Sequence, residues 1–311
     1  MKRSAAIAVV LLLVFAALPC FADGFNIGNA SNFAILYEGN GGHTLQTTNV
    51  TLYGNVGVGS TGHMTDSGPS TFYAAGSTVP GSGTVYFSAA NTGQFSNNNA
   101  ANQFSGPVFN SSMVTDALST VNALNSALGG IAGTSITIHN NTTINASSGM
   151  LSTLPACLNC RIFTLTSFNT TNSNIVTING AASDYVVINI GFSVNFNNQV
   201  TLTGGITEDH VLWNFVGGTN LNGGPTLQIN TNASSYPSLA AQGIFLDPNG
   251  AISLTNANIT GRVFGGGTHD LQYVSGTTVD APPAVPEPAA LILFGTGVLA
   301  VGSASRRKFR S

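Results

Sequence analysis

The densest group of titratable side chains in the sequence is the run Glu208-Asp209-His210, and a second acidic segment, Asp247-Pro248-Asn249-Gly250, follows it. Calcium binds several oxygen ligands in one site, so Glu208, Asp209 and Asp247 would bind it if the fold brought these carboxylates together. The simpler interpretations are a solvated turn for residues 208–210 and a β-turn for residues 247–250. We expect no metal site, no cofactor and no catalytic residue in this chain.

The elements that would position these residues are mostly short β-strands. Apolar residues alternate with Thr, Ser or Asn in many short runs, and Gly, Asn or Pro separates nearly every run from the next. The spacing, often about 8–12 residues, allows a sandwich, a barrel or a β-solenoid, and we find no strict repeat. The stretch from about 57 to 105 is rich in Gly, Ser, Asn and Thr. We expect long loops there, with one or two weak strands.

One segment has the periodicity of a helix instead. Its apolar residues recur at i, i+3, i+4 and i+7, and Gly129-Gly130 supply a stop. The pattern predicts an amphipathic helix over about 112–128 that packs against β-structure through a single apolar face. The apolar positions are Val114, Ala117, Leu118, Val121, Leu124 and Leu128.

The amino-terminal segment has the order of a secretory signal peptide. Lys2 and Arg3 precede an apolar run over residues 5–18, and Cys20-Phe21-Ala22 offers small residues at the cleavage positions. We therefore predict a signal helix over residues 1–22, with cleavage after Ala22. Lipidation at Cys20 is the alternative, but Pro19 stands where a lipobox has a small residue.

Cys157 and Cys160 lie in the part of the chain that remains after the leader is removed. In an exported protein the expected state of such a close pair is a local disulfide that staples one turn. A redox motif would need a thioredoxin-like βαβ context, and a zinc site would need two further ligands. Free thiols are the remaining alternative.

The carboxyl-terminal segment combines three features in a fixed order. Pro286-Glu287-Pro288 is followed by an apolar stretch over residues 289–304 and then by a basic end that includes Arg306 and Arg307. This arrangement resembles the PEP-CTERM sorting tail of exported bacterial proteins. The resemblance implies an exosortase-type partner, with cleavage or anchoring near the Pro-Glu-Pro triplet.

The physical character of this tail agrees with the resemblance. Its apolar stretch of about 16 residues is slightly shorter than the roughly 20 that span a bilayer as a helix. The basic residues after it favour the cytoplasmic side of a membrane. We predict a C-terminal transmembrane helix within residues 286–311, preceded by a Pro-rich linker over residues 277–285. A plain membrane anchor is the alternative to a sorting tail.

Charge is distributed unevenly along the chain. Of the 8 Lys and Arg residues, six lie in the leader and the tail, so Arg161 and Arg262 alone remain between them. All 11 acidic residues lie between residues 23 and 288, which gives this part a net charge of 2 − 11 = −9. An acidic surface without lysine excludes nucleic acid and anionic lipid as expected partners.

The same composition is poorly suited to catalysis. No Gly-x-Ser-x-Gly elbow, zinc motif or phosphate loop is present. A polysaccharide lyase usually needs a basic residue or a metal cluster, and a glycosidase needs two facing carboxylates about 5–10 Å apart, which no paired motif indicates. We predict that the protein is not an enzyme, and a glycan-active enzyme is the third-ranked function.

A second resemblance extends over most of residues 25–280. It rests on Val211-Leu212-Trp213-Asn214-Phe215, on residues 243–252, and on Ile259-Thr260-Gly261-Arg262-Val263-Phe264, with Asn32-Phe33-Ala34-Ile35-Leu36 and residues 54–58 near the start. These segments resemble the ice-binding-protein-like β-helix family and the related choice-of-anchor A exported domains. The resemblance implies an irregular right-handed β-solenoid over residues 23–276, with one long helix packed alongside and the last strands next to the first.

Ice binding, as a property of that family, would need a flat face of ordered hydroxyl and methyl groups. Two Thr-x-Thr segments offer candidates, although the chain has no long Thr-x-Thr ladder at a fixed period and Thr also favours strands for other reasons. The candidate binding face consists of Thr164, Thr166, Thr201 and Thr203.

We therefore expect a mainly β, exported protein anchored at the cell envelope or released to the cell surface or extracellular matrix. Its first expected role is structural or adhesive. The alternative is binding of ice or polysaccharide through a flat solenoid face.

Overall fold

The computed structural model describes residues 24–283 except 60, 172–173, 198, 218–225 and 233–239. The expected signal helix, sorting tail and transmembrane helix lie outside the described residues. Residues 23–283 form one compact unit with its own core, so we expect this segment to fold by itself. Within the described part of the chain, no helix combines the length and the hydropathy of a membrane span.

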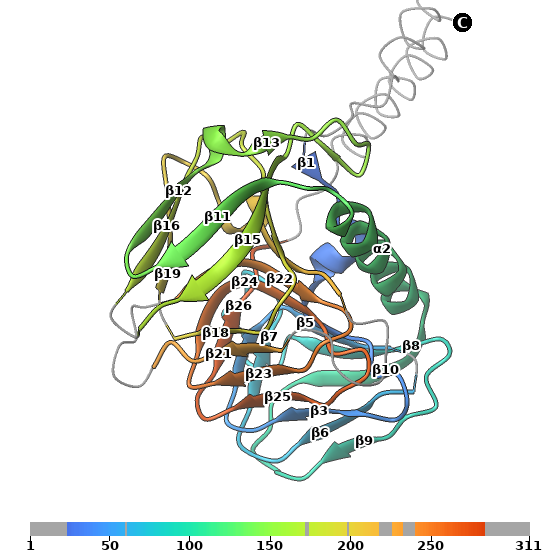
Figure 1. Ribbon diagram of the computed structural model, residues 1–311. Helices are drawn as coiled ribbons and strands as arrows, with labels where there is room; N and C mark the ends of the chain where they lie inside the picture. The colour runs from blue at the N-terminus through green and yellow to red at the C-terminus, as the bar shows by residue number, and fades with distance from the viewer. Residues whose placement is uncertain are drawn as a thin grey trace, which may run out of the picture. The chain divides into compact units, whose positions relative to one another are not determined.

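The unit is a stack of parallel strands arranged as a β-solenoid, which confirms the fold expected from the second resemblance (Figure 1). Its largest sheet has 14 strands. The main path of that sheet, in spatial order, is β10 (Ser105–Ser111), β8 (Thr84–Ser88), β5 (Asn55–Val58), β2 (Phe33–Tyr37), β24 (Asn258–Gly265), β22 (Ala241–Asp247), β20 (Val211–Phe215), β17 (Val186–Ile190), β15 (Arg161–Asn169) and β11 (Thr134–His139).

A second sheet has seven strands, all paired in parallel. They are, in spatial order, β18 (Val194–Phe196), β21 (Leu227–Ile229), β23 (Ile252–Thr255), β25 (Leu271–Val274), β3 (Thr44–Thr47), β6 (His63–Asp66) and β9 (Phe95–Asn97). Most of its inward side chains are apolar and buried, with Thr47 and Asp66 as buried polar exceptions, and the side chains between them face outward, which is the half-buried strand pattern.

The remaining strands are short. β12 (Thr142–Asn145), β16 (Ile175–Asn179) and β19 (Gln199–Thr203) form a three-stranded parallel sheet, and β26 (Thr278–Asp280), β4 (Thr51–Tyr53) and β7 (Thr71–Tyr73) extend from the first half of β24. The antiparallel pairs are β1 (Gly24–Phe25) with β14 (Cys157–Leu158), and β13 (Met150–Leu151) with β15. Three short 3₁₀ helices complete the described elements: η1 (Gly28–Asn32), η2 (Ala146–Ser148) and η3 (Glu208–His210).

The last strands of the domain lie next to the first, as the family resemblance implies. β24 pairs with β2, β25 with β3 and β26 with β4, each in parallel. The first strands also pair on their other side, because β2 lies between β24 and β5. The first coil, β2 to β4, and the last coil, β24 to β26, therefore meet in the middle of the stack, and neither forms its edge.

The one long helix among the described residues, α2 (Ser112–Gly129), covers one side of the 14-stranded sheet (Figure 1). Its buried residues are the six that the periodicity predicts, and they pack against Leu36, Leu212, Phe264 and neighbouring side chains of the central strands. Strands β17 and β20 are consequently buried on both faces, which explains why they are apolar except for one asparagine each, Asn189 and Asn214.

The expectation of long loops between residues 57 and 105 is wrong. The structure has strands β6, β7, β8 and β9 within this segment, each paired in parallel with neighbouring coils. Strands β6, β7 and β8 each bury only one to three side chains, such as Met64, Phe72 and Phe87, and β9 buries none completely, so the local sequence signal is weak. These strands depend more on hydrogen bonds from adjacent coils than on the β-propensity of their own residues.

Two glycines allow neighbouring strands to bend in the same place. Gly261 divides β24 into a first part that pairs with β26 and a second part that pairs with β2. Gly261 has φ +136° and Gly243, its partner in β22, has φ +127°. Residues other than glycine rarely adopt φ angles in this region. A Cβ atom added to Gly261 would lie 2.0 Å from the Gly243 carbonyl oxygen, so the backbones meet without space for a methyl group.

We predict that Gly261→Ala lowers the free energy of unfolding by about 1–3 kcal/mol or more, from backbone strain with a steric clash added. Urea denaturation of the 23–283 domain measures the change. Gly191→Ala is the matched control, because Gly191 has no positive φ and an added Cβ there meets nothing within 4 Å. Equal stability of the two variants would show that the corner does not require glycine.

Candidate functional site

The outer side of the seven-stranded sheet carries one uninterrupted row of uncharged polar side chains. The row is formed by in-register neighbours on all seven strands, and each member is exposed or half-buried. The residues before them in each strand, such as Leu271 and Leu45, point into the core. We call this set the amide row: Asn195, Gln228, Ser253, Gln272, Gln46, Thr65 and Ser96.

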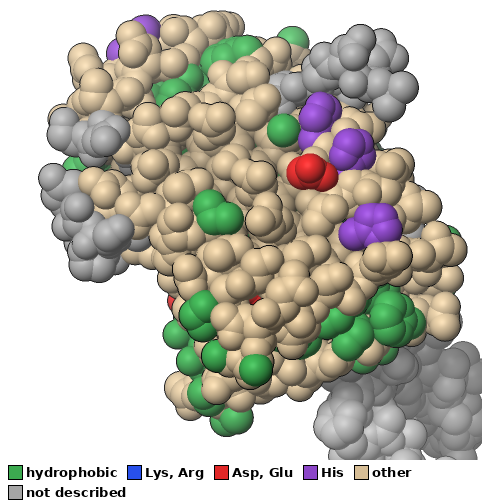
Figure 2. All heavy atoms as spheres, turned by 90° about the horizontal axis from the view of Figure 1, so that it is seen from below, with side chains coloured by type: hydrophobic (Ala, Val, Ile, Leu, Met, Phe, Trp, Pro, Cys, Tyr) green, Lys and Arg blue, Asp and Glu red, His purple; other side chains and the backbone are tan. Residues whose placement is uncertain are grey.

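The surface around the amide row has little charge. Figure 2 shows a face made mostly of backbone and of side chains that are neither hydrophobic nor charged, with histidines gathered beside an acidic side chain near one edge. At the ends of β3 and β25, His43 Nδ1 lies 3.4 Å from Asp270 Oδ1, and the His43 and His269 rings stack at 6.3 Å between centroids. Asp270 also accepts a 2.8 Å hydrogen bond from the Thr44 backbone N–H, so it orders the start of β3.

The four threonines proposed from the sequence lie on two different sheets. Thr164 and Thr166 belong to β15, whereas Thr201 and Thr203 belong to β19. The Thr164 hydroxyl accepts a 2.9 Å hydrogen bond from Gly133 N–H, and the Thr166 hydroxyl donates one of 2.9 Å to the Ile136 carbonyl. The hydroxyls on β15 are therefore occupied within the protein.

Thr201 instead belongs to a threonine row that the sequence analysis missed. Thr143, Thr177 and Thr201 are in-register neighbours across β12, β16 and β19, and Asn145, Asn179 and Thr203 form the next outward row. The three threonines are separated by 34 and 24 residues in the sequence, because the coils differ in length. A search of the sequence for a fixed repeat length therefore does not detect this row.

The interpretation of residues 208–210 as a solvated turn is wrong for Asp209. This carboxylate forms an ion pair with the guanidinium of Arg262, a side chain only 1% exposed. Burial raises the pKa of Asp209, and the adjacent Arg262 opposes that shift. The guanidinium also donates hydrogen bonds to the carbonyls of Ser31, at 3.0 Å, and Pro282, at 2.6 Å. The described residues contain no cluster of three metal-ligating side chains.

Cys157 and Cys160 are joined by a disulfide in the structure. Cys157 lies on β14 and pairs with Phe25 of β1, so the stapled turn holds the start of the described chain. The residues of the proposed sorting motif, Pro286, Glu287, Pro288, Arg306 and Arg307, lie outside the described residues.

The Asp247 turn closes the carboxyl end of β22. Asp247 Oδ1 accepts a 2.9 Å hydrogen bond from Gly250 N–H, as expected for a β-turn, but Oδ2 is buried without a hydrogen-bond partner. Burial raises the pKa of Asp247 well above its ordinary value. The fold thus holds a carboxyl group where its ionised form is disfavoured.

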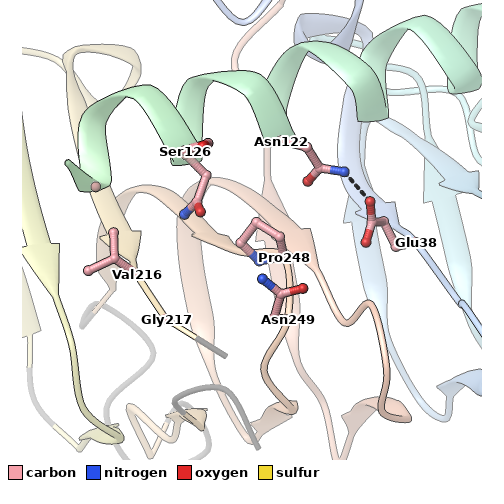
Figure 3. Close-up of a pocket in the computed structure, with 9 residues that line it drawn as sticks. Glu38, Asn122, Ser126, Val216, Gly217, Pro248 and Asn249 are labelled. Atoms are coloured by element: carbon pink, nitrogen blue, oxygen red, sulfur yellow. Dashed lines mark hydrogen bonds between the residues drawn. The ribbon is translucent and has the colours of Figure 1, made fainter. Parts of the chain in front are cut away.

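Pro248 and Asn249 of this turn line a cavity of about 500 Å³ beneath α2, whose lining is both polar and apolar (Figure 3). Asn122 donates a hydrogen bond to Glu38 Oε1, and Asn125 donates to Asn214 Oδ1 at 2.7 Å and to the Phe215 carbonyl at 2.8 Å. Burial raises the pKa of Glu38, and the hydrogen bond from Asn122 partly offsets this.

Comparison with known families confirms both sequence resemblances. The family model of an ice-binding-like adhesive domain matches residues 22–275, and that of the PEP-CTERM protein-sorting motif matches residues 284–308. Among curated proteins no match was found.

Solved structures of ice-binding proteins are similar to the chain at low sequence identity. One from the Antarctic ascomycete Antarctomyces psychrotrophicus is 15% identical, with 85% of this chain and 100% of that chain covered at a TM-score of 0.48. One from an Antarctic biological consortium is 19% identical, with coverages of 82% and 90% and a TM-score of 0.48. One from an Antarctic Flavobacteriaceae bacterium is 18% identical, with coverages of 85% and 48% and a TM-score of 0.50. The match to the Flavobacteriaceae structure, at a TM-score of 0.50, supports a shared fold and nothing beyond the fold.

We predict that Asp247→Asn reduces the pH dependence of stability. A raised folded-state pKa means that the folded protein binds the proton more tightly, so the free energy of unfolding decreases as pH rises above the unfolded value of about 3.9. The variant should lose part of this decrease and exceed the native protein in stability at pH 8. Denaturation of both proteins at pH 5 and pH 8 measures how the free energy of unfolding changes with pH.

Asp116→Asn is the control, because it also removes one negative charge but from an exposed position on α2. If Asp247→Asn showed the same difference between pH 5 and pH 8 as Asp116→Asn, ionisation of the buried carboxyl would not contribute.

Proposed function

Because the chain belongs to the ice-binding-like adhesive domain family and carries a PEP-CTERM sorting motif, we propose that it is a surface adhesin that binds a neutral extracellular polysaccharide through the amide row. The sorting motif implies export, processing by an exosortase and sorting to the cell envelope. The role on the envelope is structural or adhesive, in contact with the extracellular matrix.

The amide row carries this proposal. Amides and hydroxyls both donate and accept hydrogen bonds, and they match the hydroxyl groups of a polysaccharide without requiring charge on either partner. Seven strands at a spacing of about 4.8 Å extend the row over roughly 29 Å, long enough for several sugar units. Such a surface favours an extended polymer, because many weak contacts act together along one line.

The charges of the described residues support a neutral partner. Arg262 is buried in its pair with Asp209, which leaves Arg161 as the other arginine of the described chain. A surface with so few cations cannot release counterions from nucleic acid or attract anionic lipid. We infer that anionic polymers are poor ligands.

The same chemistry supports a non-enzymatic role. The adhesive domain family is of a non-enzymatic kind. Glu38 is the single carboxyl group among the described residues that line the cavity beneath α2, whereas glycoside hydrolysis uses a pair. We infer that the domain holds its ligand without cleaving it.

Ice binding is the second candidate, favoured by the Thr143–Thr177–Thr201 row, which presents hydroxyl and methyl groups together. The structurally similar proteins are named ice-binding proteins, which is a property of those proteins. The row has only three members, and the longer amide row contains four amides, which suits hydrogen bonding to a polymer better than an ordered hydroxyl and methyl array.

We predict that Gln46→Ala with Gln272→Ala weakens polysaccharide binding by roughly tenfold or more. Two lost hydrogen bonds at about 0.5–1.5 kcal/mol each correspond to that range. Affinity electrophoresis of the 23–283 domain in gels containing neutral polysaccharides measures the change. Thr177→Ala with Thr201→Ala is the control on the other face and should leave retention unchanged.

The two pairs of variants also distinguish the two functions. If the native domain inhibits ice recrystallisation at micromolar concentration and only the threonine variant loses that activity, ice binding replaces the polysaccharide proposal. Absence of retention in every neutral polysaccharide would contradict the proposal directly.

We predict that replacing Pro286-Glu287-Pro288 with alanines removes the protein from its sorting route. The adhesive domain is a separate compact unit, so its fold should not change. Fractionation of cells into envelope and medium, with immunodetection, should show loss of the native distribution and accumulation of the unprocessed form. Distribution identical to that of the native protein would mean that the motif does not direct sorting.

A further inference from the structure

We propose that the cavity beneath α2 is a second binding site, which takes a single unit of a neutral saccharide. The proposal deepens the adhesive function above and rests on it for the class of ligand. The site is separate from the amide row, because it belongs to the 14-stranded sheet and the row belongs to the seven-stranded sheet.

The position of the cavity follows from the parallel sheet. Glu38 comes directly after β2, Val216 after β20, and Pro248 and Asn249 after β22. Parallel strands end at the same edge, so these residues meet there, and the second half of α2 covers them. Figure 3 shows the helix residues facing Pro248 and Asn249 across the cavity. The volume of about 500 Å³ lies within the range of about 300–1,000 Å³ found for small-ligand sites.

Some of the polar groups in the cavity are fixed and others have no partner within the protein. Asn125 and Asn122 are held by the hydrogen bonds described above, and Glu38 Oε2 makes only a long 3.4 Å contact with Asn40. The Ser126 hydroxyl and the Asn249 side-chain amide line the same cavity without a hydrogen-bond partner among the described residues. These groups supply three donor hydrogens, one from the Ser126 hydroxyl and two from the Asn249 amide, and several acceptors to an incoming molecule.

The chemistry of the lining selects the class of ligand. No Lys or Arg is among the described lining residues, so a phosphate or carboxylate would find no opposite charge. One carboxyl group is too few for a typical calcium site. Amides, a hydroxyl and a carboxyl group beside the apolar surfaces of Pro248 and Val216 fit a molecule with many hydroxyls and a C–H face. A neutral sugar unit has this character.

The test is titration of the 23–283 domain with neutral sugars, followed by two-dimensional NMR. The probes are glucose, galactose, mannose, N-acetylglucosamine and cellobiose. We expect saturable shifts in the amide signals of residues 122–126 and Asn249 with at least one probe. We also expect the affinity to fall at least fivefold in Asn249→Ala and in Ser126→Ala. Neither side chain has an internal hydrogen bond, so both variants should fold, and the dispersion of the same spectra verifies it.

Gln46→Ala with Gln272→Ala is the matched control and should bind the small sugars like the native domain. Binding that is lost in this control but kept in the cavity variants would overturn the proposal, as would the absence of saturable shifts with every probe. Equal affinity for glucose 6-phosphate and glucose would contradict the claim that the cavity selects neutral sugars. Retention in polysaccharide gels tests the amide row independently. If the cavity site fails its test, the proposal for the amide row is therefore still decided by the gel measurement.

Discussion

The parallel pairing of the last coil with the first is the constraint on which the other features of the domain depend. Through the β2–β24, β3–β25 and β4–β26 pairs, the first and last coils of the described chain lie in the interior of the stack. Arg262 reinforces this junction, because its guanidinium reaches a carbonyl near each end, Ser31 and Pro282, and pairs with Asp209. A buried ion pair contributes little net stability, since desolvation offsets much of the attraction. Its value here is geometric, because it fixes three segments at one point.

The surface chemistry is a consequence of the same junction. The central neighbours of the amide row, Gln46 and Gln272, come from opposite ends of the domain and become adjacent only when β3 pairs with β25. On the side of the 14-stranded sheet beneath α2, strands that are buried on both faces end at one edge, and the residues that follow them form the cavity. One strand arrangement therefore supplies an open, uncharged face and a covered, polar pocket. The scarcity of basic side chains outside the leader and tail suits both, since neither requires ionic contacts.

Several parts of this arrangement could be predicted from the sequence. The apolar stripe from Val114 to Leu128 identified the helix and its buried face, because helical periodicity is a local property. The solenoid and the adjacency of first and last strands came from the family resemblance, not from periodicity. For residues 57–105 the sequence indicated only one or two weak strands, where the structure has four, because each strand buries few side chains and depends on hydrogen bonds from its neighbours.

The binding surfaces could not be predicted for a related reason. Cross-strand neighbours such as Thr143, Thr177 and Thr201 are set by register, and variable coil lengths hide register from any search for a fixed period. The proposed Thr-x-Thr pairs shared a sequence pattern but not a sheet. Asp209 looked like part of a solvated turn, because its partner Arg262 lies 53 residues away in the sequence.

The most direct test of this account is a cysteine cross-link between Gln46→Cys and Gln272→Cys in the 23–283 domain. In-register neighbours on adjacent strands lie about 4.8 Å apart, so a short bifunctional reagent should join them in high yield. The pair Gln46→Cys with Gln228→Cys, three strands apart at about 14 Å, should remain unlinked. Equal yields for the two pairs, or no cross-link between residues 46 and 272, would contradict the junction and the amide row together.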